Sequence, residues 1–152
     1  MSLIKKCSLI VALAASGCAH LVAMTPEVVQ QDGKMVFTAP KEKVFQAVQD
    51  ALEALNVGVA LAKPESGLVV SKRFVLAAYA SRGRYVVTGN EDTIQYDISV
   101  RPASEASVEV VVSSRGYHNN MEVTEREVWQ LDGPQGQRER WQRLFAEIKR
   151  ML

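Results

Sequence analysis

Residues 93–101 read Thr-Ile-Gln-Tyr-Asp-Ile-Ser-Val-Arg, and this stretch decides the fold class. Apolar and polar side chains alternate along it, which is the period of a β-strand with one buried side and one side in water. After a turn predicted at 102–106, the alternation returns at 107–114. We therefore expect two antiparallel neighbouring strands that place their isoleucines, valines and tyrosine on the same side of a sheet.

Two other stretches have the period of an amphipathic helix. In residues 40–55, apolar side chains recur at steps of three and four. Pro40 suits the first helical turn, and Asn56 and Gly58 can end the helix. A second apolar stripe runs from Trp141 to Leu152. Each predicted helix therefore has one face made for burial.

Further strands are predicted from β-rich runs, at 34–38, 57–62, 68–74 and 84–88. A turn at 63–67, with a proline and a glycine, makes a hairpin of the second and third runs. Gly89-Asn90 is predicted to turn the fourth run back into the strand at 93–101. Residues 117–129 have no clean period, so a loop, a short strand and a helical turn all stay open there.

One arrangement buries all of these apolar surfaces, with both helices packed on one face of an antiparallel sheet. The sequence thus predicts an α+β fold with a sheet of four to five strands, in the order β-α-β-β-β-β-α, as a single domain over 34–152. The other face of the sheet, which carries Gln95, Asp97 and Arg101, is then open to solvent or to a partner.

The N-terminal end has the pattern of a cleaved secretory signal. Lys5 and Lys6 precede an apolar run at 9–15. This run is about half the roughly 20 residues that a membrane-spanning helix needs, so a permanent anchor helix is not expected. Small residues then lead to Cys18.

The stretch Ala15-Ser16-Gly17-Cys18 resembles a bacterial lipoprotein signal, although Ala15 stands where such signals most often carry leucine. The resemblance implies a signal peptide over 1–17, a diacylated Cys18 as the mature N-terminus, and a lipidated tether over 18–33. Ala19, in place of the aspartate that retains enteric lipoproteins in the inner membrane, implies the outer membrane and its periplasmic face. An ordinary signal peptide cut near Gly17 is the alternative.

Charge and cysteine content exclude several classes of function for the mature chain. Removing Lys5 and Lys6 leaves 16 basic against 17 acidic residues, a net charge near −1. A near-neutral domain lacks the clustered basic excess of a nucleic-acid-binding protein. Cys7 leaves with the signal and Cys18 is expected to be acylated, so no disulfide, thiolate metal site or cysteine nucleophile is expected.

The search for catalytic and cofactor motifs predicts neither an enzyme nor a cofactor. A set of Ser113 or Ser114, His118 and a nearby glutamate lacks the G-x-S-x-G pattern of a nucleophile elbow, so we interpret His118 as a surface loop residue. No pair of histidines has the spacing of metal ligands, and we interpret Glu122 and Glu125 as part of a solvated charge run. No glycine-rich phosphate loop opens a helix.

Residues 74–85 combine apolar bulk with two tyrosines and two arginines, the residue types that are enriched at interface hot spots. The segment is either a strand with an ordinary connecting turn or a surface for a partner, and its arginines are alternatively placed against anionic lipid headgroups. The candidate partner-binding residues are Tyr79, Arg82, Arg84, Tyr85, Gln95, Asp97 and Arg101.

The predicted two-layer arrangement resembles the helix-grip family of domains. The lipoprotein signal, the helix in FTAPKEKVFQAVQDALEALN (37–56) and the turn and strand in KPESGLVVSKR (63–73) are together similar to the repeated domains of the C-type lipoprotein of the β-barrel assembly machinery (BamC). The resemblance covers roughly 34–152, with one domain in place of two and a shorter tether.

The resemblance implies a non-enzymatic, membrane-tethered module for protein interaction or envelope assembly, held by its lipid and serving an envelope protein partner. Two alternatives stay open, a carrier lipoprotein for a lipid or small apolar ligand and a cell-envelope enzyme. A carrier needs an apolar cavity between sheet and helices, whereas an enzyme needs a cleft with convergent polar groups. Neither the oligomeric state nor the identity of the partner follows from the sequence.

Overall fold

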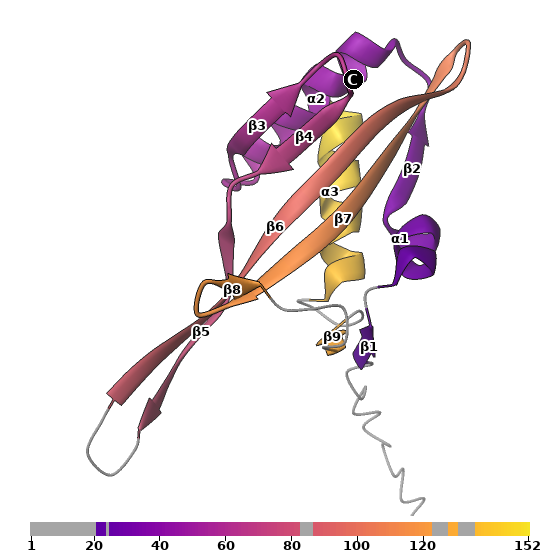
Figure 1. Ribbon diagram of the computed structural model, residues 1–152. Coiled ribbons are helices and arrows are strands. Elements are labelled where there is room, and N and C mark those ends of the chain that lie inside the picture. Colours follow the sequence, from indigo (N-terminus) through magenta and orange to yellow (C-terminus); the bar gives the residue numbers. More distant parts are fainter. Residues whose placement is uncertain (1–20, 24, 83–86, 123–127, 131–135) are drawn as a thin grey trace, which may run out of the picture.

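The computed structural model describes residues 21–23, 25–82, 87–122, 128–130 and 136–152 of the 152-residue chain (Figure 1). The elements in chain order are β1 (Leu21–Ala23), α1 (Pro26–Asp32), β2 (Lys34–Phe37), α2 (Lys41–Ala54), β3 (Val59–Lys63), β4 (Leu68–Ser71), β5 (Phe74–Arg82), β6 (Val87–Ser104), β7 (Ser107–His118), β8 (Met121–Glu122), β9 (Val128–Gln130) and α3 (Gln137–Met151). The class is α+β, as the sequence predicts.

In the described part of the chain, seven strands form one antiparallel sheet and β1 pairs separately with β9. The spatial order is β2-β7-β6-β4-β3, with β5 on β6 and β8 on β7. The alternating stretches identified in the sequence lie at the centre of the sheet, where Ile98 pairs with Val112 and Val100 pairs with Val110. The sheet is larger than the predicted four to five strands, because β5 and β8 extend it along the two long central strands.

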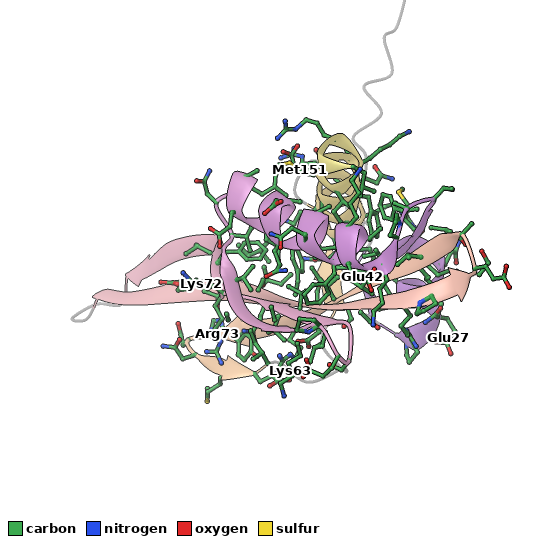
Figure 2. The ribbon with its side chains drawn as sticks, turned by 90° about the horizontal axis from the view of Figure 1, so that it is seen from above. Glu27, Glu42, Lys63, Lys72, Arg73 and Met151 are labelled. Atoms are coloured by element: carbon green, nitrogen blue, oxygen red, sulfur yellow. The ribbon has the colours of Figure 1, made fainter. Side chains whose placement is uncertain are left out.

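Helices α2 and α3 contact each other and cover one face of the sheet (Figure 2). Within α2 the apolar side chains between Val44 and Leu52 are buried, as the three- and four-residue spacing predicts. Helix α3 buries Trp141, Leu144, Phe145 and Ile148. The alternate residues of β6 from Ile94 to Val100 meet these helices and complete a single core.

A short polar chain links α3 to the sheet inside this core. The indole Nε1 of Trp141 donates to Ser114 Oγ at 3.1 Å, and Ser114 Oγ donates to Gln137 Oε1 at 3.1 Å. Both Trp141 and Gln137 are buried. Burying these polar groups is tolerated because each has a partner, and the bonds fix α3 at one position along β7.

Strands β4 and β5 lie end to end along the same side of β6. The register changes by one residue between them, since Val70 pairs with Asp97 whereas Phe74 pairs with Ile94. Ser71 fills the gap in the ladder, because its Oγ accepts from the backbone N–H of Tyr96 at 2.8 Å. Beyond this irregularity β5 and β6 continue as a long hairpin, whose first pair, Phe74 with Ile94, still packs against the core (Figure 1).

The hairpin formed by β5 and β6 differs from one sequence prediction. Gly89-Asn90 does not turn the chain but lies within β6, which is continuous from Val87 to Ser104. Tyr79 pairs with Asn90 and Ala80 pairs with Gly89, so ladder pairing with β5 overrides the turn preference of the dipeptide. Pro102 likewise belongs to β6, where it pairs with Val108, and the turn is confined to Glu105-Ala106.

A third helix also differs from the sequence prediction, which placed 18–33 in a tether and expected two helices. Helix α1 begins after Thr25, whose Oγ1 accepts from the N–H of Val28, and Pro26 occupies its first turn. Val28 and Val29 pack against the core. The N-cap, the proline and the glycine that ends the helix were readable signals, but a seven-residue helix is too short to show a hydrophobic period.

Candidate interaction surface

The face of the sheet opposite the helices is the candidate surface, and we call it the open face. Gln95, Asp97 and Arg101 lie on it, because their neighbours Ile94, Tyr96, Ile98 and Val100 are buried against the helices. In Figure 2, Lys63 and Arg73 lie on the opposite side of the sheet from Glu42 of α2 and Met151 of α3. The alternation in the sequence therefore predicts which residues of β6 face away from the core.

Asp97 and Arg115 form the shortest ion pair of the open face. Arg115 Nη2 donates to Asp97 Oδ1 at 2.8 Å, and Arg115 Nε lies 2.6 Å from Asp97 Oδ2. The hydrogen bond to this carboxylate raises the pKa of the Arg115 guanidinium above its usual value, against a smaller opposing effect of burial. Asp97 is thus engaged in an ion pair within the chain.

Gln95 belongs to a second polar chain that crosses three strands, β4, β6 and β7. Its Nε2 donates to the carbonyl of Ser71 at 2.9 Å, and its Oε1 accepts from the hydroxyl of Tyr117 at 3.2 Å. The guanidinium carbon of Arg73 lies 3.6 Å from the centre of the Tyr117 ring, which is a cation–π contact. These bonds hold Arg73 and Tyr117 in one geometry at the base of the β5–β6 hairpin.

The set of candidate residues predicted from the sequence does not include Arg73, Arg115 or Tyr117. The register of the central hairpin could have found two of them, since Arg115 pairs with Gln95, and Tyr117 pairs with Thr93. The predicted strand ended at residue 114, one residue short of this pairing. Arg73 depends on the register change between β4 and β5, which no pattern in the sequence indicates.

Charge on the open face is only partly balanced. Lys34 pairs with Glu109 at 3.6 Å, and Arg115 pairs with Asp97. Among the described residues, Lys63, Arg73 and Arg101 have no ion-pair partner. Apolar side chains also reach solvent here, in particular Val36, Leu61 and Val75, which are 53, 41 and 54% exposed. A surface of this kind suits binding, because it combines cations that have no ion-pair partner with exposed apolar side chains.

The remaining candidates lie on or near the hairpin. Tyr79 and Arg82 belong to β5, where they pair with Asn90 and Val87. Arg84 and Tyr85 lie outside the described residues, as does Cys18. The structure therefore places Tyr79 and Arg82 on a different part of the sheet from Gln95, Asp97 and Arg101, so the seven candidates do not form one site.

His118 makes a cross-strand pair with Asp92. Its Nδ1 lies 2.7 Å from Asp92 Oδ1, and its Nε2 lies 3.3 Å from Asn119 Nδ2. Asn119 is itself bonded to the backbone of Glu91 and has a left-handed φ of 49°, so the three residues close the end of β7 onto β6. Ser113 and Ser114 are not bonded to His118, because their hydroxyls bond Asp97 and Gln137. The set of Ser113 or Ser114 with His118, which the sequence analysis considered and did not favour, is therefore not joined by hydrogen bonds.

Two further searches cover the described residues only. Within these residues, histidine, cysteine and carboxylate side chains nowhere gather in a group that could hold a metal ion. The described helices are all too short or too polar to cross a membrane.

Comparison with known proteins gives a weak structural similarity and no family match. No protein-family model matches the chain, and no curated protein matches it. Among solved structures, it is similar to a DUF4468 family protein from Bacteroides ovatus ATCC 8483, with 11% sequence identity and a TM-score of 0.44. The match covers 86% of this chain and 91% of that one. At this level of similarity the match carries no inference about function.

Proposed function

We propose that this chain is an outer-membrane lipoprotein whose single domain faces the periplasm and serves as a non-enzymatic module for protein interaction or envelope assembly. One observation carries the proposal, namely Ala15-Ser16-Gly17-Cys18 after a basic and then apolar leader. The acyl chains on Cys18 are the membrane anchor. Confinement to the membrane surface raises the effective concentration of the domain near membrane partners.

The start of the folded domain supports this arrangement. Leu21, the first residue of β1, is three positions after Cys18, and α1 starts at Pro26. Lipoprotein maturation at Cys18 would remove residues 1–17 and leave every described element intact. The fold is thus compatible with cleavage at that position.

The packing supports an interaction module over a carrier. The layer between sheet and helices is occupied by bulky buried side chains, including Trp141, Phe145, Leu52 and Ile148. A carrier needs a cavity of several hundred cubic ångströms in this layer. We extend the proposal to a helix-grip-like arrangement of α2 and α3 on the sheet and to a role of the BamC class, in which the open face is left for a partner.

The test is crosslinking in living cells of the full-length protein, followed by purification and mass spectrometry. The proposal expects one membrane-protein partner in the wild type, and its loss in a Cys18→Ala variant that cannot be acylated. The matched control is Ser16→Ala, which keeps the cysteine. Recovery of the wild-type protein without any partner, or with the same partner in the Cys18→Ala variant, would contradict the tethered module.

A further inference from the structure

The margin of the open face that β3 and β4 form carries an apolar pair between two cations. Leu61 of β3 pairs with Val70 of β4, and Val70 pairs in turn with an open-face position of β6. Figure 2 shows Lys63 and Arg73 on this same side of the sheet. Lys63 pairs with Leu68 at the start of β4, and Arg73 follows the end of that strand, so at most about 17 Å of chain separates the two cations. Leu61 and Val70 lie between them.

Neither of these cations is neutralised within the described part of the chain. Lys63 and Arg73 are both exposed and have no ion pair there. The carboxylate beside them on β6, Asp97, is engaged by two nitrogens of Arg115, at 2.8 and 2.6 Å. Glu65 follows in the turn after β3 and makes no ion pair with Lys63. Positive charge is therefore left over on both sides of the apolar pair, and its complement is an anionic partner.

Arg73 is held in place before any partner binds. Its guanidinium carbon lies 3.6 Å from the centre of the Tyr117 ring, and the Tyr117 hydroxyl donates to Gln95. Gln95 donates in turn to the carbonyl of Ser71, two residues before Arg73. A stacked guanidinium keeps the N–H groups at its edge available for a carboxylate. Because its position is already fixed, Arg73 loses little conformational freedom on binding, as expected of an interface hot spot.

The exposed apolar side chains favour a protein partner over a membrane. Among the described residues, the large apolar side chains that are exposed are all aliphatic or methionine. Tyr117, an aromatic residue of the open face, is only 3% exposed and lies under Arg73. Segments that lie on a membrane instead present tryptophan or tyrosine rings to the interface. The open face thus has cations and aliphatic surface without an exposed aromatic anchor in its described part.

The edge of β3 is less suited to a partner than the face. The backbone N–H of Val59 donates to Glu53 Oε1 at 3.1 Å, so this group is already bonded. The register also shifts between Val59 and Leu61, and such irregularities are a common protection of edge strands against strand addition. A partner is therefore expected to contact this margin through the side chains of the open face.

From these observations we propose that the open face binds an acidic segment of a protein partner along β3 and β4. Carboxylates of the segment pair with Lys63 and Arg73, and an apolar side chain between them packs on Leu61 and Val70. The inference rests on the proposed function as an interaction module and adds to it the chemistry of the partner and the place where it binds.

The experiment uses the lipidated full-length protein in phosphatidylcholine nanodiscs and measures the fluorescence anisotropy of labelled peptides. The probe is a short peptide in which two glutamates flank a leucine and are about 17 Å apart in an extended chain. Three matched peptides carry glutamines in place of the glutamates, lysines in place of the glutamates, or serine in place of the leucine.

The glutamate peptide should bind more tightly than the glutamine and serine peptides. Lys63→Glu combined with Arg73→Glu should weaken its binding about tenfold or more, because like charges then meet. The same double variant should bind the lysine peptide more tightly than the wild type does, which a merely misfolded protein would not. Arg143→Glu with Lys149→Glu, two exposed cations of α3, is the matched control and should leave every affinity unchanged.

Equal binding of the glutamate and glutamine peptides would overturn the inference, as would an unchanged affinity in the Lys63→Glu, Arg73→Glu variant. A membrane ligand is tested with an environment-sensitive fluorophore at Leu61→Cys in nanodiscs that contain phosphatidylglycerol. Lipid-quenched emission there, without a preference for the glutamate peptide, would overturn the protein partner and assign the face to the membrane.

The anchor is measured separately in the same preparations, as palmitate on Cys18. An acylated chain without a preference for the glutamate peptide would contradict this inference alone. A chain that prefers the glutamate peptide but has no palmitate would contradict the anchor alone. The two failures are therefore distinguishable.

Discussion

The two halves of β6 are held in different ways. One half packs against the helices, and the other only pairs with β5. From Ile94 to Val100, alternate side chains are buried under α2 and α3, and both neighbouring strands contribute to the ladder. From Val87 to Glu91 the same strand pairs with β5 alone. The half from Ile94 to Val100 has a side-chain pattern that fixes its register. The half from Val87 to Glu91, which contains Gly89-Asn90, depends on backbone hydrogen bonds. Stability is therefore concentrated in the half that packs against the helices.

Truncating Trp141, the largest fully buried side chain among the described residues, should destabilise the packed half most strongly. Trp141→Ala removes a fully buried indole and its bond to Ser114, so we expect a loss of about 3–5 kcal/mol in the free energy of unfolding. Urea unfolding followed by circular dichroism measures it. Val75→Ala, at an exposed position at the base of the β5–β6 hairpin, should change the same quantity by less than about 0.5 kcal/mol. Equal losses in the two variants would contradict the comparison.

Two glycines with positive φ, Gly58 and Gly67, sharpen the comparison at the edge of the packed half. A Cβ at Gly67 would lie 2.1 Å from the carbonyl oxygen of Val100, whereas a Cβ at Gly58 would meet only the flexible side chain of Lys72, at 3.1 Å. We expect Gly67→Ala to cost about 3 kcal/mol and Gly58→Ala about 1 kcal/mol, because both pay for the left-handed backbone but only the first displaces β6. Thermal unfolding should rank the two variants in this order, and the reverse order would refute the argument.

Alkaline pH should weaken the packed half through Tyr96. Burial raises the pKa of this phenol from 10.0 to about 12. Because the folded state holds the proton more tightly, the corresponding stability is present below pH 10 and is lost as pH rises from about 10 to 12, by roughly 2–3 kcal/mol. Unfolding midpoints in urea across this range measure the loss. Tyr96→Phe should remove that share of the slope, and an unchanged slope would show that other groups cause it.

The smallest effect is expected on the open face. Asp97 and Arg115 are 29 and 40% exposed, and solvent screening keeps such pairs below about 1 kcal/mol. A double-mutant cycle with Asp97→Asn and Arg115→Gln measures the coupling. A coupling of several kcal/mol would mean that the open face contributes to folding, and would weaken its assignment as a surface left for a partner.

Sequence reasoning predicted the elements whose side chains are sorted by burial. The central strands, α2 and α3 follow from the alternation around Tyr96 and from the stripes that include Val48 and Trp141. It missed the elements held by other means. Helix α1 depends on its cap at Thr25, and the β5–β6 hairpin depends on pairing that overrides the turn preference of Gly89-Asn90.

The residues of the candidate surface were likewise only partly predictable from the sequence. Alternation assigned Gln95, Asp97 and Arg101 to the open face, which the burial of their neighbours confirms. It could not supply Arg73, because the irregularity at Ser71 shifts the register by one residue and sets which side of the sheet this arginine takes. The partners of a polar side chain come from neighbouring strands, so they need the register as well as the period.

The central claim is that Cys18 is acylated and anchors the domain at the membrane. The most direct measurement is metabolic labelling of cells with a radioactive or clickable palmitate, followed by purification of the full-length protein and mass spectrometry of its N-terminal peptide. The account predicts label on a mature chain that begins at Cys18, and no label in Cys18→Ala. An unlabelled wild-type chain, or a mature N-terminus at any other residue, would contradict it.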